Sequence, residues 1–271
     1  MLASGLSLAW GVMNEINIAH GSIAILGSYV AYWALELWGI DPVVSIAISV
    51  PFCLVLGAAL QQFVNMTSTR IPQAKIEFYS YLIFFGMLFI SEGLMVAIWG
   101  GRFRAIRTAY NQTSVFLGPI ALPLPTLIGF VFGTALTLAV YYSLKKTYTG
   151  MAVRATADDR EIAMAMGINT HRIYVYTFAI GSGLAAIGGM CLGLLTIFYP
   201  DIQFYWITRL FAIVVLGGMG NLLGTYLGSL ILGVAVSLTT VFTTASWADV
   251  VAYVMLIIVL TVRPKGLFGA R

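Results

Sequence analysis

The residues of this chain that could take part in chemistry are few, and most stand next to or inside apolar segments. Asn14, Glu15, Asn17 and His20 crowd into the stretch NEINIAHGS between two apolar runs. Ionisable groups at membrane depth are costly and usually face a cavity or a helix interface. The stretch is therefore a candidate for contact with a transported solute. For His20, an interfacial histidine bonded to a backbone carbonyl is the alternative.

Glu92 is a single carboxylate near the far end of the apolar run Phe78–Trp99. A proton relay would need a second acid, and that run contains none, so the sequence favours a cavity-lining or helix-packing role. Glu15 and His20 form the only nearby pair of catalytic residue types. Their spacing of five residues does not align them on one face of a straight helix, which disfavours an intramembrane enzyme.

Motifs for nucleotide, metal or acyl chemistry are missing from the sequence. None of the four lysines follows a glycine, so no P-loop is present, and the two histidines and two cysteines are scattered. No Gly-x-Ser-x-Gly elbow occurs. Gly181–Ala186 formally matches a dinucleotide fingerprint, but an unbroken apolar run explains the same residues better. We expect a conduit that is not an enzyme, binds no cofactor and takes its energy from elsewhere.

Composition predicts a membrane protein. Of the 271 residues, 60% are hydrophobic and only 9% are charged, with a mean hydropathy of +0.95, whereas soluble domains carry about 25% charged residues. The net charge of +4 comes from basic residues beside the apolar runs, and no nucleic-acid footprint is visible. We predict an all-α fold: a polytopic membrane helix bundle in which residues 1–271 form a single transmembrane domain.

About eight to nine membrane segments are expected, including short or re-entrant pieces. The first run is too short to cross a hydrocarbon core of roughly 30 Å at about 1.5 Å per residue. It is therefore either re-entrant or what is left of a truncated first helix. The apolar runs are Leu2–Met13, Gly21–Trp38, Val43–Phe63, Phe78–Trp99, Thr126–Leu144, Ile173–Phe198, Tyr205–Leu216, Thr225–Phe242 and Asp249–Val262. The interval Gly100–Pro125 is expected to be a long loop whose prolines forbid regular helix.

Small residues recur in two stripes that would let helix backbones approach closely. One stripe follows every fourth position from Gly181 to Gly193, and the other runs from Gly217 to Gly228. The second includes GGMGNLLG, which predicts a break between two half-helices. Irregular backbone at membrane depth survives only where protein shields it or where it lines a cavity.

The interval 144–172 is the only long polar stretch between apolar runs, and it predicts a loop in water. Within it, Thr156–Ile168 is expected to form one helix that Thr156 caps and Gly167 ends. Helical spacing puts one acid and three apolar side chains on one face: Asp159, Ile162, Ala163 and Met166. Such a surface could dock into a groove of a partner. A solvated helix packing on its own bundle is the alternative.

The distribution of Lys and Arg over alternate loops predicts the orientation. Ten lie on one side: Arg70, Lys75, Lys145, Lys146, Arg154, Arg160, Arg172, Arg263, Lys265 and Arg271. Four lie on the other: Arg102, Arg104, Arg107 and Arg209. Because positive charge favours the inner side, loop 144–172 and the C-terminus are expected to face the cytoplasm.

Five ordered motifs connect the sequence with a known family. They are INIAHG at Ile16–Gly21, TYTGMAVRATADD at Thr147–Asp159, AMAMGIN at Ala163–Asn169, VVLGGMGNLLGTYLG at Val214–Gly228 and RPKGLFG at Arg263–Gly269. Together they resemble the LivH-type permeases of branched-chain amino acid ABC importers. The resemblance covers nearly the whole chain, and it is more specific for the family than for the substrate.

The resemblance implies a multi-pass subunit in the prokaryotic cytoplasmic (inner) membrane, in contact with lipid and paired with a LivM-like second permease. Two ATP-binding subunits would bind ATP and Mg, and a periplasmic or extracellular solute-binding protein would deliver the ligand. The expected ligands are branched-chain or other hydrophobic amino acids. Urea, short amides, other small organic solutes and sugars remain alternatives, as does an ATP-independent secondary carrier.

Two sets of residues are expected to carry this function. The translocation pathway would involve Asn17, His20, Gly21, Glu92, Gly217, Gly218 and Gly220. Coupling to the ATPase would involve Arg154, Asp159, Glu161, Ile162, Ala163, Met166 and Gly167. The sequence departs from the family pattern in three places: an extra helix usually precedes Leu2–Met13, an acid often stands where this chain has Val236, and Glu15 is unusual in its motif.

Overall fold

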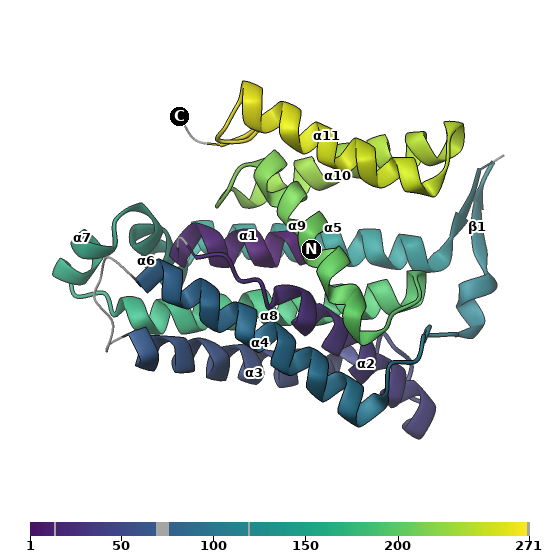
Figure 1. Cartoon of the computed structure of the whole chain (residues 1–271), viewed down its shortest axis with the longest axis horizontal. Helices are drawn as coiled ribbons and strands as arrows, with labels where there is room; N and C mark the ends of the chain where they lie inside the picture. Colours follow the sequence, from purple (N-terminus) through teal and green to yellow (C-terminus); the bar gives the residue numbers. More distant parts are fainter. Residues whose placement is uncertain (14, 69–75, 119, 270–271) are drawn as a thin grey trace.

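The chain forms an all-α bundle with one small β-hairpin (Figure 1). The structure, a computed structural model, describes every residue except 14, 69–75, 119 and 270–271. Asn14, Arg70, Lys75 and Arg271, which entered the sequence predictions, thus lie outside the described residues. The helices are α1 (Leu2–Met13), α2 (His20–Trp38), α3 (Ile46–Ser68), α4 (Ile76–Trp99), α5 (Leu124–Lys146), α6 (Tyr148–Asp158), α7 (Arg160–Ala165), α8 (Thr170–Leu195), α9 (Gln203–Gly217), α10 (Leu222–Phe242) and α11 (Ala245–Val262).

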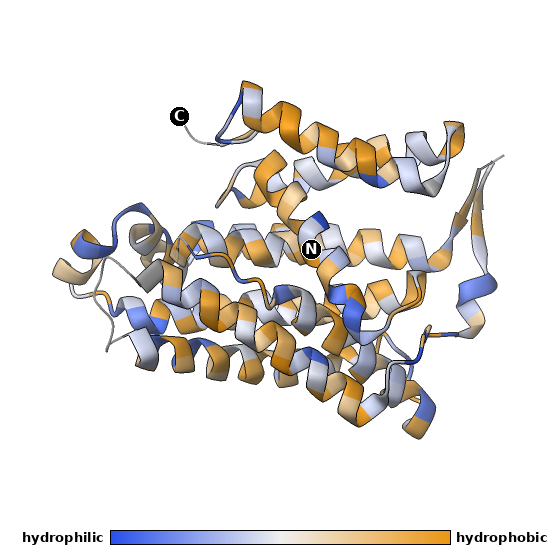
Figure 2. Cartoon of the chain, viewed as in Figure 1, coloured by the Kyte–Doolittle hydropathy of each residue, from blue (hydrophilic) through white to orange (hydrophobic). Residues whose placement is uncertain are grey.

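Each predicted apolar run coincides with one helix, and the boundaries differ by only a few residues. Among the described residues, α3, α4, α5, α8 and α10 are long and apolar enough to cross a membrane. The bundle exposes large apolar side chains along these helices and along α11. Figure 2 shows hydrophobic residues along the length of the helices. An apolar outer surface of this extent suits a protein whose solvent is lipid.

Helix α8 is the centre of the bundle, and 78% of its apolar window is buried. Small residues allow this position, because a Cβ at Gly5 would lie 2.8 Å from the Gly181 carbonyl oxygen of α8. A Cβ at Gly189 would lie 1.7 Å from the Ala24 carbonyl oxygen of α2. The predicted stripe from Gly181 to Gly193 therefore does bring helix backbones together.

The predicted helix Thr156–Ile168 is wrong in its boundaries. Helix α6 ends at Asp158, and α7 starts at Arg160 after Asp159 adopts an extended conformation with φ −154° and ψ 114°. Thr156 does not cap a helix; its hydroxyl donates to the Ala152 carbonyl within α6. Asp159 is the cap instead, since its Oδ1 accepts from the Ile162 N–H at 2.9 Å. Gly167 follows α7 with a φ of +85°, a left-handed conformation that glycine tolerates.

The interval Gly100–Pro125 contains a hairpin that the sequence did not predict. Strand β1 (Ser114–Leu117) pairs antiparallel with β2 (Ile120–Pro123), and Ser114 lies opposite Pro123. Pro123 ends the strand and Pro125 lies in the first turn of α5, two positions where a missing N–H is tolerated. Figure 1 shows the hairpin at one end of the bundle and α6–α7 at the other.

Candidate functional site

Residues 15–19, between α1 and α2, have an irregular backbone and are largely buried. The N mark in Figure 1 lies midway along the bundle, and the chain runs along α1 toward the α6–α7 end before it returns to α2. The return brings the His20 ring to Leu2, whose carbonyl oxygen lies 3.1 Å from Nε2. Asn17 and His20 are each only 1% exposed, and Glu15 is 7% exposed. Irregular backbone in a membrane bundle is a common feature of transport pathways.

The alternative reading of His20, a ring bonded to a backbone carbonyl, agrees with this geometry. Asn17 differs, because its buried Oδ1 has no hydrogen-bond partner among the described residues. A buried, unpartnered amide oxygen is costly and is available to bind a donor. Gly21 lies against α9, where a Cβ would lie 2.8 Å from the Gln203 carbonyl oxygen. Its lack of a side chain therefore brings the start of α2 and the start of α9 into contact.

Gln203 connects three helices through its side-chain amide. The Ser22 hydroxyl of α2 donates to Gln203 Oε1, and Gln203 Nε2 donates to Glu92 Oε2 of α4 at 3.0 Å. Gln203 is fully buried. Neither Gln203 nor Ser22 was predicted as a site residue. The sequence signal was weak: a lone amide just after the turn Tyr199–Asp201 that precedes α9.

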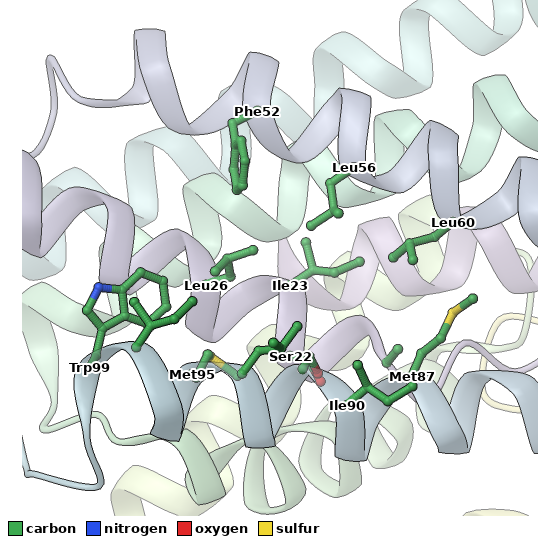
Figure 3. Close-up of a pocket in the computed structure, with 14 residues that line it drawn as sticks. Ser22, Ile23, Leu26, Phe52, Leu56, Leu60, Met87, Ile90, Met95 and Trp99 are labelled. Atoms are coloured by element: carbon green, nitrogen blue, oxygen red, sulfur yellow. The ribbon is translucent and has the colours of Figure 1, made fainter.

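A cavity of about 430 Å³ opens beside this polar network, between α2, α3 and α4 (Figure 3). Ser22 and Ser91 are its only aliphatic hydroxyl side chains, and most of the remaining lining is apolar. Leu26, Phe52, Leu56, Leu60, Met87, Ile90 and Met95 contribute to that apolar wall. Its size falls in the range of small-molecule sites, about 300–1,000 Å³. A wall that is almost wholly apolar, with the hydroxyls of Ser22 and Ser91 at its margin, can hold the apolar part of a small solute.

The predicted break in GGMGNLLG is confirmed as geometry. Helix α9 ends at Gly217, Gly218 and Gly220 have φ values of +101° and +74°, and Asn221 caps α10 by accepting from the Gly224 N–H at 2.9 Å. The break does not line the apolar cavity. It lies instead beside α6, in a second cavity of about 580 Å³ that Arg154, Asp158 and Gly220 help to line.

The coupling residues predicted from the sequence differ in how exposed they are on α6, α7 and the turn after α7. Ile162 and Met166 are 63% and 79% exposed, whereas Ala163 is only 2% exposed and packs inward. The predicted common face of these three residues is therefore wrong, because α7 is too short and too tightly packed to expose Ala163. Arg154, Asp159, Glu161 and Gly167 are also exposed.

Arg160 attaches α7 to the bundle. Its guanidinium lies 5.4 Å from the centre of the Tyr174 ring of α8, a cation–π distance. Tyr174 also belongs to one apolar cluster with Met13, at the end of α1, and Ile18 of the irregular segment packs against that cluster. The short helix α7 is thus linked to α8 close to the buried polar stretch.

At the hairpin end, a basic and aromatic cluster holds the loop after α4. The Arg104 guanidinium lies 5.0 Å from the Tyr32 ring centre and donates to the Trp99 carbonyl at 2.9 Å. The Tyr110 hydroxyl donates to Asp41 at 3.3 Å. Burial and the neighbouring Asp41 carboxylate raise the pKa of Tyr110 to about 12.

In the part of the chain that the structure describes, no group of three or more His, Cys, Asp or Glu side chains could hold a metal ion. Cys53 and Cys191 are buried, free thiols.

The interrupted helices, the buried polar segment and the cavity define a polytopic membrane transport protein. Comparison with known proteins gives the family: a model described as branched-chain amino acid transport system / permease component matches residues 1–260. The chain belongs to this family of permeases.

Curated relatives support this assignment. The chain is 30% identical to the high-affinity branched-chain amino acid transport system permease protein LivH of Escherichia coli K12, over 99% of the chain and 90% of LivH. It is 27% identical to the permease protein BraD of Pseudomonas aeruginosa, over 99% of the chain and 91% of BraD. It is 25% identical to the ribose import permease protein RbsC of Escherichia coli K12, over 86% of the chain and 71% of RbsC. No solved structure matches the chain.

Proposed function

We propose that this chain is the membrane-spanning subunit of an ATP-driven importer for branched-chain or other hydrophobic amino acids. Family membership over residues 1–260 and the names of LivH and BraD support the transport class and the substrate class. The substrate class is supported most directly by the cavity between α2, α3 and α4, whose wall is almost wholly apolar. Desolvating an aliphatic side chain there is favourable, about 0.8 kcal/mol for each buried CH₂ group.

The polar edge of the cavity suits the charged end of an amino acid. Ser22 lines the cavity and joins Glu92 and Gln203, which do not line it, in one hydrogen-bonded network. Asn17 precedes this serine in the chain, and its buried amide oxygen has no hydrogen-bond partner among the described residues. A carboxylate such as Glu92 can attract an α-ammonium group, and amide or hydroxyl donors can bind an α-carboxylate. A sugar would need many more polar groups than the two serines of the wall supply, because each buried hydroxyl without a partner costs about 1–3 kcal/mol.

The complete importer would contain a LivM-like second permease, two ATP-binding subunits that bind ATP and Mg, and a periplasmic or extracellular solute-binding protein. This chain would contribute no catalytic group and bind no cofactor itself. Residues 1–271 would act as one transmembrane domain of eight to nine segments in the lipid of the inner membrane. Interval 144–172 and the C-terminus would face the cytoplasm, as the ten-to-four distribution of basic residues predicts.

Helix α7 would be the contact through which ATP drives the transport cycle. Ile162 and Met166 offer apolar surface to a groove of the ATPase, while Ala163 and Arg160 hold α7 on the bundle. Arg154, Glu161 and Gly167 would shape the same surface. Closure of the ATPase would move α7 and α8 and rock the bundle around the buried segment with Asn17, His20 and Gly21, which is alternating access. Gly217, Gly218 and Gly220 would let α9 and α10 reorient at their break.

The test is to purify the chain with its associated subunits and measure uptake into proteoliposomes. We expect an ATPase and a second permease to co-purify, and uptake of leucine to require ATP and the solute-binding protein. Uptake without ATP would indicate a secondary carrier and overturn the proposal. Uptake of ribose or urea in place of leucine would leave the importer class intact and overturn the substrate.

A further inference from the structure

Two sequence motifs that are far apart in the chain meet at the α6–α7 end of the bundle. After α11, residues 263–269 turn back and contact the break between α9 and α10. The Leu267 N–H donates to the Leu216 carbonyl oxygen at 2.9 Å. The last carbonyls of a helix have no partner within the helix itself, so this bond supplies a donor that α9 lacks. We call residues 263–269 the C-terminal clasp.

Asn221 holds the break from both sides. Its Oδ1 accepts from the Gly224 N–H at 2.9 Å and so caps α10. Its Nδ2 donates to the Phe268 carbonyl oxygen of the clasp at 2.6 Å. One side chain therefore starts α10 and fastens the clasp, through two different atoms.

Glycines make the close approach possible. A Cβ at Gly266 would lie 2.5 Å from the Gly218 Cα, and a Cβ at Gly218 would lie 2.7 Å from the Gly269 nitrogen. Both Gly218 and Gly266 have positive φ values, +101° and +86°, which other residues rarely adopt. A Cβ at Gly11, at the end of α1, would lie 2.4 Å from the Gly220 Cα. The break is thus enclosed by backbone from α1 and from the clasp.

The clasp also contacts three helices through Leu267, which is partly buried. Leu267 packs against a cluster contributed by α9, α10 and α11: Leu216, Leu232, Ala252 and Val259. We propose that the clasp is a positioning segment that makes α9, α10 and α11 move as one body during transport. The second cavity lies between the clasp and α6. A movement of α6 and α7 would therefore act on α9, α10 and α11 together. This inference rests on the proposed ATP-driven transport.

The experiment uses Asn221→Asp in the complete importer. A carboxylate keeps the cap on α10 but cannot donate to the Phe268 carbonyl, so the substitution releases the clasp selectively. Hydrogen exchange of the Leu267 amide reports the release directly, without reference to activity. The second measurement is the number of substrate molecules imported for each ATP hydrolysed. Asn169→Asp is the matched control for exchange, because Asn169 caps α8 through Oδ1 in the same way, accepting from the Arg172 N–H at 3.1 Å.

We expect Asn221→Asp to raise exchange of the Leu267 amide roughly two- to tenfold, the range that the loss of one hydrogen bond produces. Import per ATP should fall severalfold while ATP hydrolysis continues, and Asn169→Asp should leave Leu267 exchange unchanged. A second variant that ends at Lys265 removes the rest of the clasp and should lose coupling more completely. Normal import per ATP in the truncated variant, or in Asn221→Asp once Leu267 is released, would overturn the inference. A wild-type complex with no ATP-driven uptake would instead overturn the proposed function.

Discussion

The capping role of Asp159 predicts a specific failure of coupling. Asp159 separates α6 from α7, and its Oδ1 accepts from the Ile162 N–H at 2.9 Å. Asp159→Arg removes this cap, at a cost of about 1 kcal/mol. It also puts a positive charge at the positive end of α7, at a cost of about 0.3–1 kcal/mol. The sum of about 1.3–2 kcal/mol lowers the ratio of formed to unformed helix roughly ten- to thirtyfold.

Because α7 presents Ile162 and Met166 outward, its loss should uncouple ATP hydrolysis from uptake without affecting the rest of the bundle. The assay is uptake and ATP hydrolysis by the reconstituted complex, with the amount of chain in the membrane measured in parallel. Asp159→Asn retains a capping oxygen and should keep most of the uptake. Normal uptake by Asp159→Arg would refute the coupling role. Equal loss in both variants would refute the cap as the cause and point to the negative charge itself.

Four further predictions concern other parts of the structure. Met166→Asp changes a side chain that is 79% exposed, so we expect normal membrane insertion, measured by membrane fractionation, and abolished ATP-driven uptake. Gln203→Leu leaves the serine and the acid that it bridges without their partner, and should lower stability by about 1–3 kcal/mol, seen as a lower Tm. Leu56→Trp fills the apolar cavity and should reduce leucine uptake at least tenfold; Val55→Trp, at a neighbouring side chain that is 70% exposed, is its control and should not. The pKa of Tyr110, about 12 in the folded chain against 10.0 for a free tyrosine, means that its contribution to stability is present below about pH 10 and is lost as the pH rises toward 12. Between those values the Tm of Tyr110→Phe should therefore fall less than that of the wild type.

Long-range apolar pattern was enough to predict the bundle, because lipid forces every crossing segment to satisfy its backbone within a helix. The runs are confirmed for that reason. The break in GGMGNLLG was predictable for a different reason, because glycines at Gly218 and Gly220 adopt the left-handed φ values that end a helix, as Gly167 does just after α7. Helix propensity could not locate the interruption at Asp159, since residues on both sides of it favour helix. The hydrogen bond that fixes the interruption is donated by the backbone N–H of Ile162 to the Asp159 side chain. The hairpin was missed because its two strands are only four residues long each, too short for an alternating pattern to stand out.

The candidate site was only partly predictable. Asn17, His20 and Glu92 stood out as polar residues in apolar surroundings, and the structure buries Asn17 and His20 almost completely. Gln203 was missed because its importance comes from Ser22 and Glu92, which lie on α2 and α4 and meet it only in the folded chain. The cavity was likewise invisible, since its wall is assembled from ordinary apolar side chains of three helices.

The central place of α8 has a consequence for the order in which the chain can fold. Helices α1, α2 and α3 each make more contact with α8 than with one another. During synthesis these three helices reach the membrane long before residues 170–195 have been made. Until then, their small-residue faces, at Gly5, Ala24 and Gly57, lack the α8 surface that they contact in the folded chain. Chains interrupted before Thr170 should remain loosely associated and open to degradation, because native packing of the first half begins only when α8 inserts among them.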